Sequence, residues 1–413
     1  MFNLTTKLLT RTRGYSRSPS AIRLCSTKLN HQFNPNPVSL QMIDYAFSLS
    51  RSQKSDESYG QGLLVLEQCE SNQHDDNGKG LVLLAISTLL SERRNFVGAI
   101  EKLNTINDLN VSCFPIRVAA IEALAGLHLE LEEDDTSSMI ADACLNDLDG
   151  IKPELGYGFG LLNARVRALK GLVELGRGHV DSSETCFEGL ENNLGAGNNA
   201  LSYAEFLHAT RDFSNAKQLY ENIIKGIPER IDYSDPYNLA AGNMAQEDIL
   251  MAATCALGQL EAHMGNFDDA EKILTRALTV TEERFGPHHP KIGIILTCIA
   301  LMFRHKATTE RSSSLMVQEG LYRRALELLK APQLETEVPQ AKVYGKDIIA
   351  LARGGYAETL CVQQNRKAAG EQMKIWAEAA WNNRRLSLSE ALDISSNPCS
   401  KIPVIDARIS RAF

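Results

Sequence analysis

The chain has 413 residues, of which 44% are hydrophobic and 23% are charged, and its formal net charge is −8. This balance is typical of folded proteins and excludes a disordered scaffold. The excess of acid also disfavours a sequence-independent nucleic-acid binder, which needs a positive surface. Aromatic residues make up only 6%, and the abundant Leu, Ala and Glu favour helices over sheets.

The nine cysteines are scattered singly along the chain, and each stands far from the next in the sequence. A CxxC motif for zinc or redox chemistry is therefore absent from the sequence, and a reducing compartment is the simplest setting. The longest nearly apolar stretch covers positions 292–303. It is much shorter than a membrane-spanning helix, which needs roughly 20 residues. We therefore expect this stretch to be a buried helix and the protein to have no membrane span.

Residues 1–43 are basic and rich in Ser and Thr, and they contain no Asp or Glu. This composition is typical of an organellar transit peptide. Arg23 occupies the third position before the bond between Cys25 and Ser26, as in a mitochondrial processing site. We therefore expect a mitochondrial transit peptide over residues 1–25, directed to the matrix, with a plastid as the second choice and a basic N-terminus on a cytosolic protein as the remaining alternative. Removal of this peptide takes away five cations and no acid, so the net charge becomes −13.

Residues 26–40 are rich in Pro and Asn after position 31 and are predicted to form a flexible linker. The folded part is predicted over residues 41–393. Within it, small and apolar residues recur five times at intervals of 12, 4 and 3 positions. The five sets are Ser87, Ala99, Leu103 and Ile106; Gly171, Ser183, Phe187 and Leu190; Ala204, Ala216, Tyr220 and Ile223; Gly258, Ala270, Leu274 and Ala277; and Ala357, Ala369, Met373 and Trp376.

The clearest set lies in residues 252–279, where Gly265 to Asp269 form a predicted turn between two helices. In the second helix the apolar residues follow the period of an α-helix. Small residues at Gly258 and Ala270 would let the two helices cross closely, with Leu274 filling the gap between them. Each set therefore predicts one helical hairpin.

Two further predicted helix pairs depart from the spacing. Residues 116–130 and 138–148 form one pair, which has Leu129 where a small residue is expected. Residues 291–305 and 314–330 form the other, with a Ser/Thr-rich insertion at Thr308–Ser314. With these two pairs we predict seven hairpins between residues 41 and 382. Ser387 to Glu390 form a capping box for a short helix, and residues 394–413 are predicted to form a peripheral C-terminal tail.

The repeated spacing resembles that of the tetratricopeptide repeat (TPR) family. The string from Glu283 to Pro290 (ERFGPHHP) is similar to the inter-repeat loop of kinesin-light-chain-type repeats, in which Gly286 ends one helix and Pro290 begins the next. The resemblance implies an all-α fold, a right-handed superhelix or α-solenoid of about seven hairpins. These units are longer than the usual repeat of about 34 residues. The excess is expected in loops at residues 192–198, 228–243 and 332–339.

Motifs that carry catalysis are missing from the sequence: there is no Gly-rich phosphate loop, nucleophile elbow or HExxH string. The pair His288-His289 has no Cys, Asp or Glu near it at ligand spacing, and we interpret it as part of a helix entry. We therefore assign no catalytic, cofactor-binding or metal-binding residue and expect a protein that is not an enzyme.

The resemblance implies that the first helices of successive hairpins line a concave groove that binds a peptide or helix of another protein. The polar candidates in this groove are Thr88, Glu92, Glu205, His208, Gln259, His263 and Glu358. TPR proteins that bind chaperone C-termini carry a Lys/Asn carboxylate clamp at such positions, and this chain does not. The groove is predicted to be mixed apolar and acidic and to prefer basic or amphipathic segments.

The predicted function is a non-enzymatic scaffold in the mitochondrion that binds other proteins and assists the assembly or regulation of a larger complex, with respiratory-complex assembly as the most concrete version. One alternative is a cytosolic cargo adaptor of the kinesin-light-chain type, which the basic N-terminus opposes. A second is an organellar RNA-binding helical-repeat protein, which the net charge of the mature chain opposes. The third, an enzyme on this scaffold, has no supporting constellation.

Overall fold

The computed structural model describes residues 33–111, 113–155, 158–190, 193–228, 233–334, 344–393 and 401–413, without the side chains of residues 151–155. The predicted transit peptide and its cleavage site between Cys25 and Ser26 lie outside these residues, as do residues 26–32 of the predicted linker and residues 394–400. The statements about structure below concern the described residues.

The described chain is almost entirely helical, with seventeen α-helices and two short strands. The α-helices are α1 (Pro37–Gln53), α2 (Asp56–Ser71), α3 (Asp76–Glu92), α4 (Phe96–Asp108), α5 (Phe114–Glu130), α6 (Asp134–Leu155), α7 (Gly158–Gly176), α8 (Val180–Phe187), α9 (Asn198–Ala209), α10 (Phe213–Gly226), α11 (Gln246–His263), α12 (Phe267–Phe285), α13 (Pro290–Glu310), α14 (Leu315–Leu328), α15 (Lys346–Cys361), α16 (Lys367–Ala380) and α17 (Leu388–Leu392). The 3₁₀ helices are η2 (Pro236–Asn238), η3 (Gly242–Met244) and η4 (Gln364–Arg366), and the strands are β1 (Ile405–Asp406) and β2 (Arg411–Ala412).

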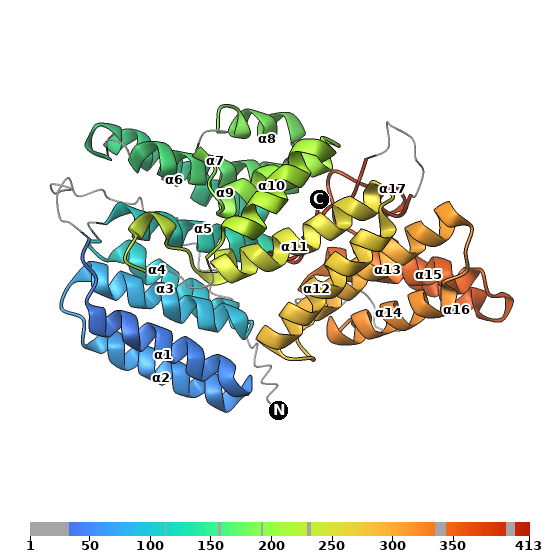
Figure 1. Ribbon diagram of the computed structural model, residues 1–413, viewed down its shortest axis with the longest axis horizontal. Coiled ribbons are helices and arrows are strands. Elements are labelled where there is room, and N and C mark those ends of the chain that lie inside the picture. Colours follow the sequence, from blue (N-terminus) through green and yellow to red (C-terminus); the bar gives the residue numbers. More distant parts are fainter. Residues whose placement is uncertain are drawn as a thin grey trace, which may run out of the picture.

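Consecutive helices pack as antiparallel pairs, from α1 with α2 to α15 with α16, and each pair also contacts the next (Figure 1). The predicted all-α repeat solenoid is confirmed. The number of pairs is eight, so the prediction of seven was wrong. The missed pair is α1 and α2, which begins with Pro37 behind an Asn36 cap and continues through a capping box at Ser55.

Two of the helix pairs follow the repeat spacing more closely than the sequence analysis recognised. In the missed pair, Ser50, Gly62, Leu66 and Cys69 have the same intervals and are all buried. The pair of α5 and α6 was predicted to depart from the spacing at Leu129. In the structure, the repeat of this pair begins one helical turn earlier, at Ala125. The residues with intervals of 12, 4 and 3 positions are Ala125, Ser137, Ala141 and Cys144, and all four are buried.

Close helix crossings depend on the small residues, as predicted. A Cβ atom on Gly258 would lie 2.6 Å from Cγ of Leu274, and one on Gly171 would lie 2.6 Å from the ring of Phe187. Real Cβ atoms do not tolerate such distances, so a larger residue would force the pair apart. At Ser183, which also lies in a crossing, the hydroxyl donates to the carbonyl of Gly171 (2.7 Å) and its polarity is satisfied.

The loop from Gly286 to Pro290 connects two hairpins as predicted. Helix α12 ends at Phe285, Gly286 adopts a φ of 85°, and Pro290 is the first residue of α13 behind the N-cap His289. Helix α13 continues to Glu310, so the predicted insertion at Thr308–Ser314 is helical over its first part, up to Glu310. By length and composition α13 alone among the described helices could cross a membrane, yet it packs between α12 and α14 as a core helix.

The last described residues contradict the predicted peripheral tail. Residues 401–413 run into the interior of the molecule, where Val404, Ile405 and Phe413 are at most 1% exposed. Figure 1 shows this end of the chain at the centre of the molecule, between the green and the orange helices. The sequence analysis missed this because a segment with two very short strands has almost no periodicity.

Candidate functional site

The segment Lys401–Phe413, which we call the groove segment, forms a short antiparallel hairpin. Ile405 pairs with Ala412 and Asp406 with Arg411, and the N–H and carbonyl groups of Val404 and Phe413 exchange two hydrogen bonds (3.1 and 2.8 Å). In the turn, the Arg408 N–H donates to Oδ1 of Asp406 (2.7 Å). A two-stranded hairpin is marginal by itself in water, so its surroundings must hold it.

The groove segment lies on the concave face of the solenoid. It contacts α5, α9, α11 and α15 through Ser410, Arg408, Ile405 and Arg411. All four are first helices of their pairs, and first helices line the concave side. Its apolar residues Val404, Ile405, Ile409 and Phe413 belong to the largest hydrophobic cluster of the molecule.

Arg408 is fully buried and is held by α9 and by its own hairpin. Its guanidinium donates to Oε2 of Glu205 (2.5 Å) and Oδ2 of Asp406 (2.9 Å), and also to the side chain of Asn198. Burial raises the pKa of Glu205 well above its usual range, and the nearby Asp406 adds to this while Arg408 opposes it. Two carboxylates therefore share one guanidinium in a site without solvent.

Arg411 joins helices that are far apart in the sequence. It donates to Oδ2 of Asp347 at the start of α15 (2.9 Å), and to Oδ1 of Asp134 (2.9 Å) at the start of α6. Burial raises the pKa of Asp347, although Arg411 opposes the shift. Beside it, the Ser410 hydroxyl donates to Oε1 of Glu130 (3.0 Å). The groove segment thus links the second half of the solenoid to the first.

The four acidic side chains of the helices around the segment, Glu130, Asp134, Glu205 and Asp347, form what we call the acidic wall. Only two guanidiniums of the groove segment, those of Arg408 and Arg411, bind to this wall. Asp406 brings a fifth carboxylate. The buried site therefore holds more carboxyl groups than guanidiniums. Burial raises the pKa of Glu130 as well, although Lys291 and Arg94 oppose the shift.

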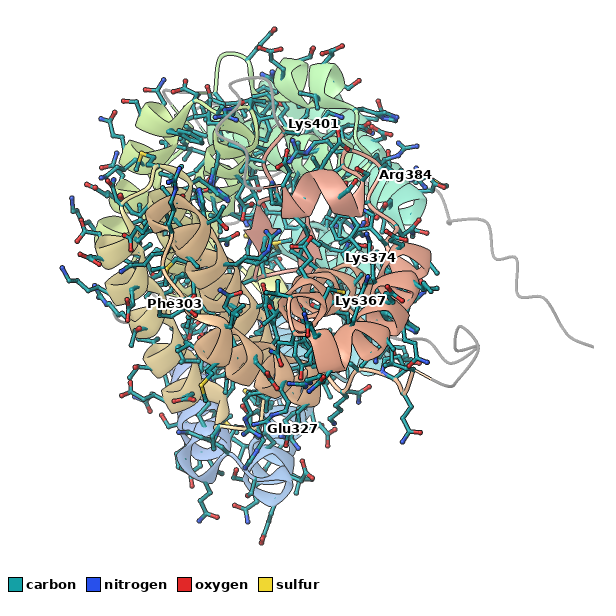
Figure 2. The ribbon with its side chains drawn as sticks, turned by 90° about the vertical axis from the view of Figure 1, so that its right-hand side faces the viewer. Phe303, Glu327, Lys367, Lys374, Arg384 and Lys401 are labelled. Atoms are coloured by element: carbon teal, nitrogen blue, oxygen red, sulfur yellow. The ribbon has the colours of Figure 1, made fainter. Side chains whose placement is uncertain are left out.

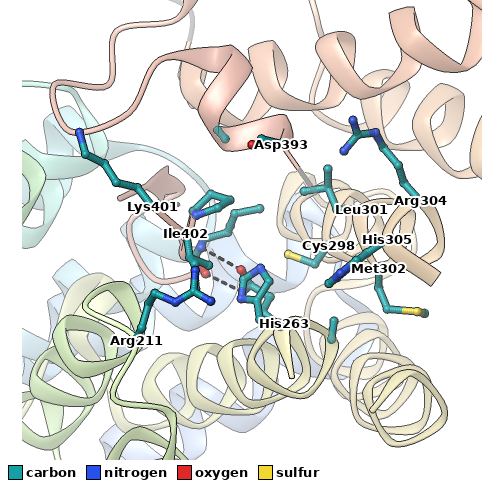
Figure 3. Close-up of a pocket in the computed structure, with 15 residues that line it drawn as sticks. Arg211, His263, Cys298, Leu301, Met302, Arg304, His305, Asp393, Lys401 and Ile402 are labelled. Atoms are coloured by element: carbon teal, nitrogen blue, oxygen red, sulfur yellow. Dashed lines mark hydrogen bonds between the residues drawn. The ribbon is translucent and has the colours of Figure 1, made fainter. Parts of the chain in front are cut away.

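The groove also binds the main chain of the segment. Gln259 of α11 exchanges two hydrogen bonds with Ile405, from Nε2 to the carbonyl (2.9 Å) and from the Ile405 N–H to Oε1 (2.8 Å), drawn as dashed lines in Figure 3. Arg385 donates to the carbonyls of Ile402 and Phe413, and Asn383 donates to the carbonyl of Ala412 (2.6 Å). Contacts to backbone groups select an extended conformation and are tolerant of sequence.

A cavity of about 200 Å³ lies where α11, α13 and α17 meet the groove segment (Figure 3). His263 lines it, and its Nδ1 lies 2.9 Å from Nε2 of His208. Burial lowers the pKa of His208 well below its usual value and that of His263 to about 3. Both rings are therefore neutral at physiological pH, and they serve as polar packing beside the groove.

The structure brings four of the seven predicted groove residues, Glu205, His208, Gln259 and His263, together around the groove segment. The other three lie elsewhere. Glu358 is on the surface, where it pairs with Arg304. Thr88 accepts from the Gly242 N–H (3.0 Å) in η3, and so supports a loop.

Glu92 is the centre of a second buried cluster, which we call the Glu92 network. Its carboxylate accepts from Arg51 of α1 (2.6 Å) and from Arg284 of α12 (2.7 Å). Arg284 also pairs with Asp248 (2.9 Å), and Lys291 pairs with the same carboxylate. Burial opposes ionisation of Glu92, but Arg284 and Arg51 outweigh it and lower the pKa to about 2. The network joins the first hairpins to α11–α13.

His289 has the structural role that was predicted for the His288-His289 pair. Its Nδ1 accepts from the Lys291 N–H (3.2 Å), its ring stacks on Phe285, and its Nε2 lies 3.1 Å from the carbonyl of Glu92. Among the residues that the structure describes, no cluster of three or more His, Cys, Asp or Glu has the geometry of a metal site.

The functional feature that sequence reasoning missed is the occupant of the groove. The sequence did contain a signal, because the end of the chain holds Arg408 and Arg411 among apolar residues, while the predicted groove is acidic. Figure 2 shows Lys401, where the segment begins, on the side of the molecule that also carries Arg384.

Comparison with known families gives a match over part of the chain. Residues 248–310, which span α11, α12 and α13, match the tetratricopeptide repeat. Comparison with the sequences of curated proteins gives no match. The matched region contains the Gly258 hairpin and Gln259, the residue that binds the main chain of the groove segment. The repeat match and the eight helical hairpins of the described residues together support a TPR-like repeat protein, and TPR repeats indicate a protein–protein interaction scaffold.

Proposed function

We propose that this protein is a mitochondrial scaffold that binds an extended segment of another protein on its concave face and assists the assembly or regulation of a larger complex. The observation that carries the proposal is the groove segment itself. An extended polypeptide already lies on the concave face, bound through its main chain by Gln259 and through two arginines by acidic side chains. A face with these contacts has the chemistry to bind a protein segment.

The charge of this face favours a protein partner over RNA. The acidic wall would repel a phosphate backbone, and nucleic-acid binding requires cations along the contact. The all-α repeat fold is typical of scaffolds without catalytic activity. The mitochondrial location rests on the basic, acid-free composition of residues 1–43, and a respiratory complex is the most concrete client.

Location is tested first with the full chain fused to a fluorescent protein at its C-terminus. We expect import into mitochondria, and mass spectrometry of the mature protein should find Ser26 at its N-terminus. The matched variant R11E/R13E/R17E removes the positive charge that import requires and should stay in the cytosol. A wild-type fusion that stays in the cytosol would contradict the location.

The scaffold role is tested by cross-linking mass spectrometry on the tagged full-length protein purified from mitochondria. We expect stoichiometric cross-links between this chain and subunits of one complex. Cross-links to a respiratory complex would identify the client in its most concrete form. A protein that is monomeric and free of cross-links in the organelle would contradict an assembly role.

A further inference from the structure

We propose that the acidic wall is a binding site for an extended, arginine-bearing segment of a partner protein, and that the groove segment occupies this site in the free protein and must be displaced. This inference rests on the proposed scaffold function and specifies its partner. It follows from the charge balance of the site, from the way the main chain is held, and from the position of the segment outside the helix pairs.

The charge balance shows that the groove segment is an imperfect ligand. The wall contributes four carboxylates, the segment adds Asp406, and two guanidiniums face them. Arg385 is a further buried cation, but its contacts are to main-chain carbonyls. Crowded carboxyl groups in a buried site are costly to ionise together, and the nearby Asp406 adds to the raised pKa of Glu205. A segment with arginines at the positions of Arg408 and Arg411, but without the acid at position 406, would complement the wall better.

Buried polar atoms without hydrogen-bond partners also indicate that the groove segment is an imperfect ligand. Among the described residues, no donor reaches Oε1 of Glu205 and no acceptor reaches Nδ2 of Asn198, although both atoms are buried. These two side chains flank the guanidinium of Arg408. A buried polar atom without a partner costs free energy, so this part of the groove can accept a ligand with one more donor and acceptor than the segment offers.

The main-chain contacts define what shape the partner must have. Gln259 binds one backbone position in both directions, and Asn383 and Arg385 bind carbonyls further along the hairpin. Side chains at Val404, Ile405, Ile409 and Phe413 fill the apolar part of the groove. The partner segment is therefore extended, with apolar residues between and beside its arginines.

The segment can leave without dismantling the solenoid. It lies outside the eight helix pairs, whose contacts run from each helix to its neighbour. Its apolar burial favours the bound state, but the conformational entropy lost by ordering the segment opposes it. Once exposed, the carboxylates of the wall would be hydrated, so a vacant groove avoids the cost of burying them. Release is thus a local opening that leaves the helices folded.

The test uses the full chain and a synthetic peptide with the sequence of residues 401–413, labelled with a fluorophore at its N-terminus. In the variant R408E/R411E, the two acids that replace the arginines repel the acidic wall and weaken the occupant. We expect this variant to bind the peptide at least about tenfold more tightly than the wild-type chain does, because a tethered competitor has a high effective concentration. Anisotropy of the fluorophore measures the affinity.

The matched control is K367E/R384E, which makes the same charge change at two exposed side chains (Figure 2). It should bind the peptide as weakly as the wild type. Among peptides, Asp406→Asn should bind to the R408E/R411E protein more tightly than the unchanged sequence, and the peptide with Glu at both arginine positions should not bind. If R408E/R411E keeps its helical circular dichroism but binds the peptide no better than the wild type, the proposal is overturned.

A second measurement needs no variant of the protein and covers the case in which R408E/R411E does not fold. The Asp406→Asn peptide, with a photoreactive benzophenone in place of Phe413, is added in excess to the wild-type chain and irradiated. We expect cross-links to α7 beside the groove, since Phe413 lies next to Gly176. Cross-links confined to other helices, or none, would overturn the proposal. The scaffold function would survive if the partner in mitochondria cross-links to the outer helices instead, and it fails separately if no partner is found.

Discussion

Two buried charge clusters close this solenoid, and they differ in their charge balance. In the Glu92 network, the acids Glu92, Asp248 and Glu247 face Arg51, Arg284 and Lys291, so charges of the two signs are equal in number. In the groove, four wall carboxylates and Asp406 face Arg408 and Arg411. The pKa of Glu92 is lowered to about 2, whereas burial raises the pKa of Glu205 well above its usual range.

This difference separates a structural contact from a binding site. In the balanced network each charge has its partner within the fold, and the loss of one leaves others buried and unpaired. In the groove, the wall has more acceptors than the segment has donors, and removal of one acid relieves repulsion. The same chemistry therefore stabilises the fold in one region and leaves the other open to a better ligand.

The largest effect is expected when the balanced network is broken. Glu92→Gln leaves Arg51 and Arg284 without their shared carboxylate, and removal of one partner from a buried ion pair costs about 3–5 kcal/mol. Chemical denaturation of the full chain measures the loss of the free energy of unfolding. Glu327→Gln, at an exposed ion pair with Arg324, is the control and should change stability by less than about 1 kcal/mol. If Glu92→Gln lowers the free energy of unfolding as little as the control does, the Glu92 network and the groove no longer differ in the way proposed.

The next effect concerns the helix crossings that both regions share. A Cβ on Gly258 would lie 2.6 Å from Leu274, so Gly258→Ala forces the hairpin apart and should cost about 1–3 kcal/mol. Gly320→Ala is the matched control, because nothing lies within 4 Å of a Cβ there, and it should stabilise α14 by about 0.5–1 kcal/mol. Thermal unfolding of both variants tests the pair. Equal shifts of the same sign would contradict close packing at Gly258.

A third prediction concerns the histidines beside the groove. The pKa of His263 is lowered from 6.5 to about 3, so the unfolded chain takes up a proton below pH 6.5 that the folded chain refuses. The stability that neutral His263 contributes is present above pH 6.5 and is lost as the pH falls towards 3. Relative to His263→Gln, the wild type should lose about 1.4 kcal/mol per pH unit below 6.5.

Denaturation of both proteins at pH 8, 7, 6 and 5 measures this difference. Between pH 7 and 8 it should be constant. If the difference in free energy of unfolding between the two proteins is also constant between pH 6 and 5, His263 is not held neutral by its surroundings.

The smallest effect is expected in the groove and completes the contrast with Glu92. Glu205→Gln keeps a side chain of the same shape beside Arg408, which still pairs with Asp406. Because the pKa of Glu205 is raised, its ionisation costs the folded state free energy, and stability rises as the pH falls through the raised pKa. The substitution removes this dependence and should change the free energy of unfolding by less than about 1 kcal/mol. A loss of unfolding free energy similar to that of Glu92→Gln would contradict the conclusion that the groove holds more carboxyl groups than its guanidiniums can pair.

The sequence predicted the repeat but only part of the site. Hairpins are local, so the spacing from Gly258 to Ala277 was sufficient to predict the α11/α12 pair, with which the family match begins. The α1/α2 pair was missed although Ser50, Gly62, Leu66 and Cys69 have that spacing. Gln259 and Glu205 were placed in the groove because inner positions follow from the helical period. Glu92 was predicted there too, but its partner Arg284 is 192 residues away, and no local pattern reveals that contact.

The groove segment could not be predicted for the same reason. Its very short strands have no period to detect, and their burial depends on helices from α5 to α15 converging on one place. Only the sign of the charge was available in the sequence, as an acidic groove and two arginines near position 410.

Hydrogen exchange of the full-length wild-type protein tests the central claim most directly. The amides of Val404, Ile405, Arg408 and Phe413 are hydrogen-bonded, as are those of the core of α11, so the rates report opening of each region. We predict that the groove-segment amides exchange at least about tenfold faster than those of Ala256 and Leu260, through an opening that leaves the helices intact. Equal rates would show that the segment leaves only when the whole fold does, and would contradict a displaceable occupant.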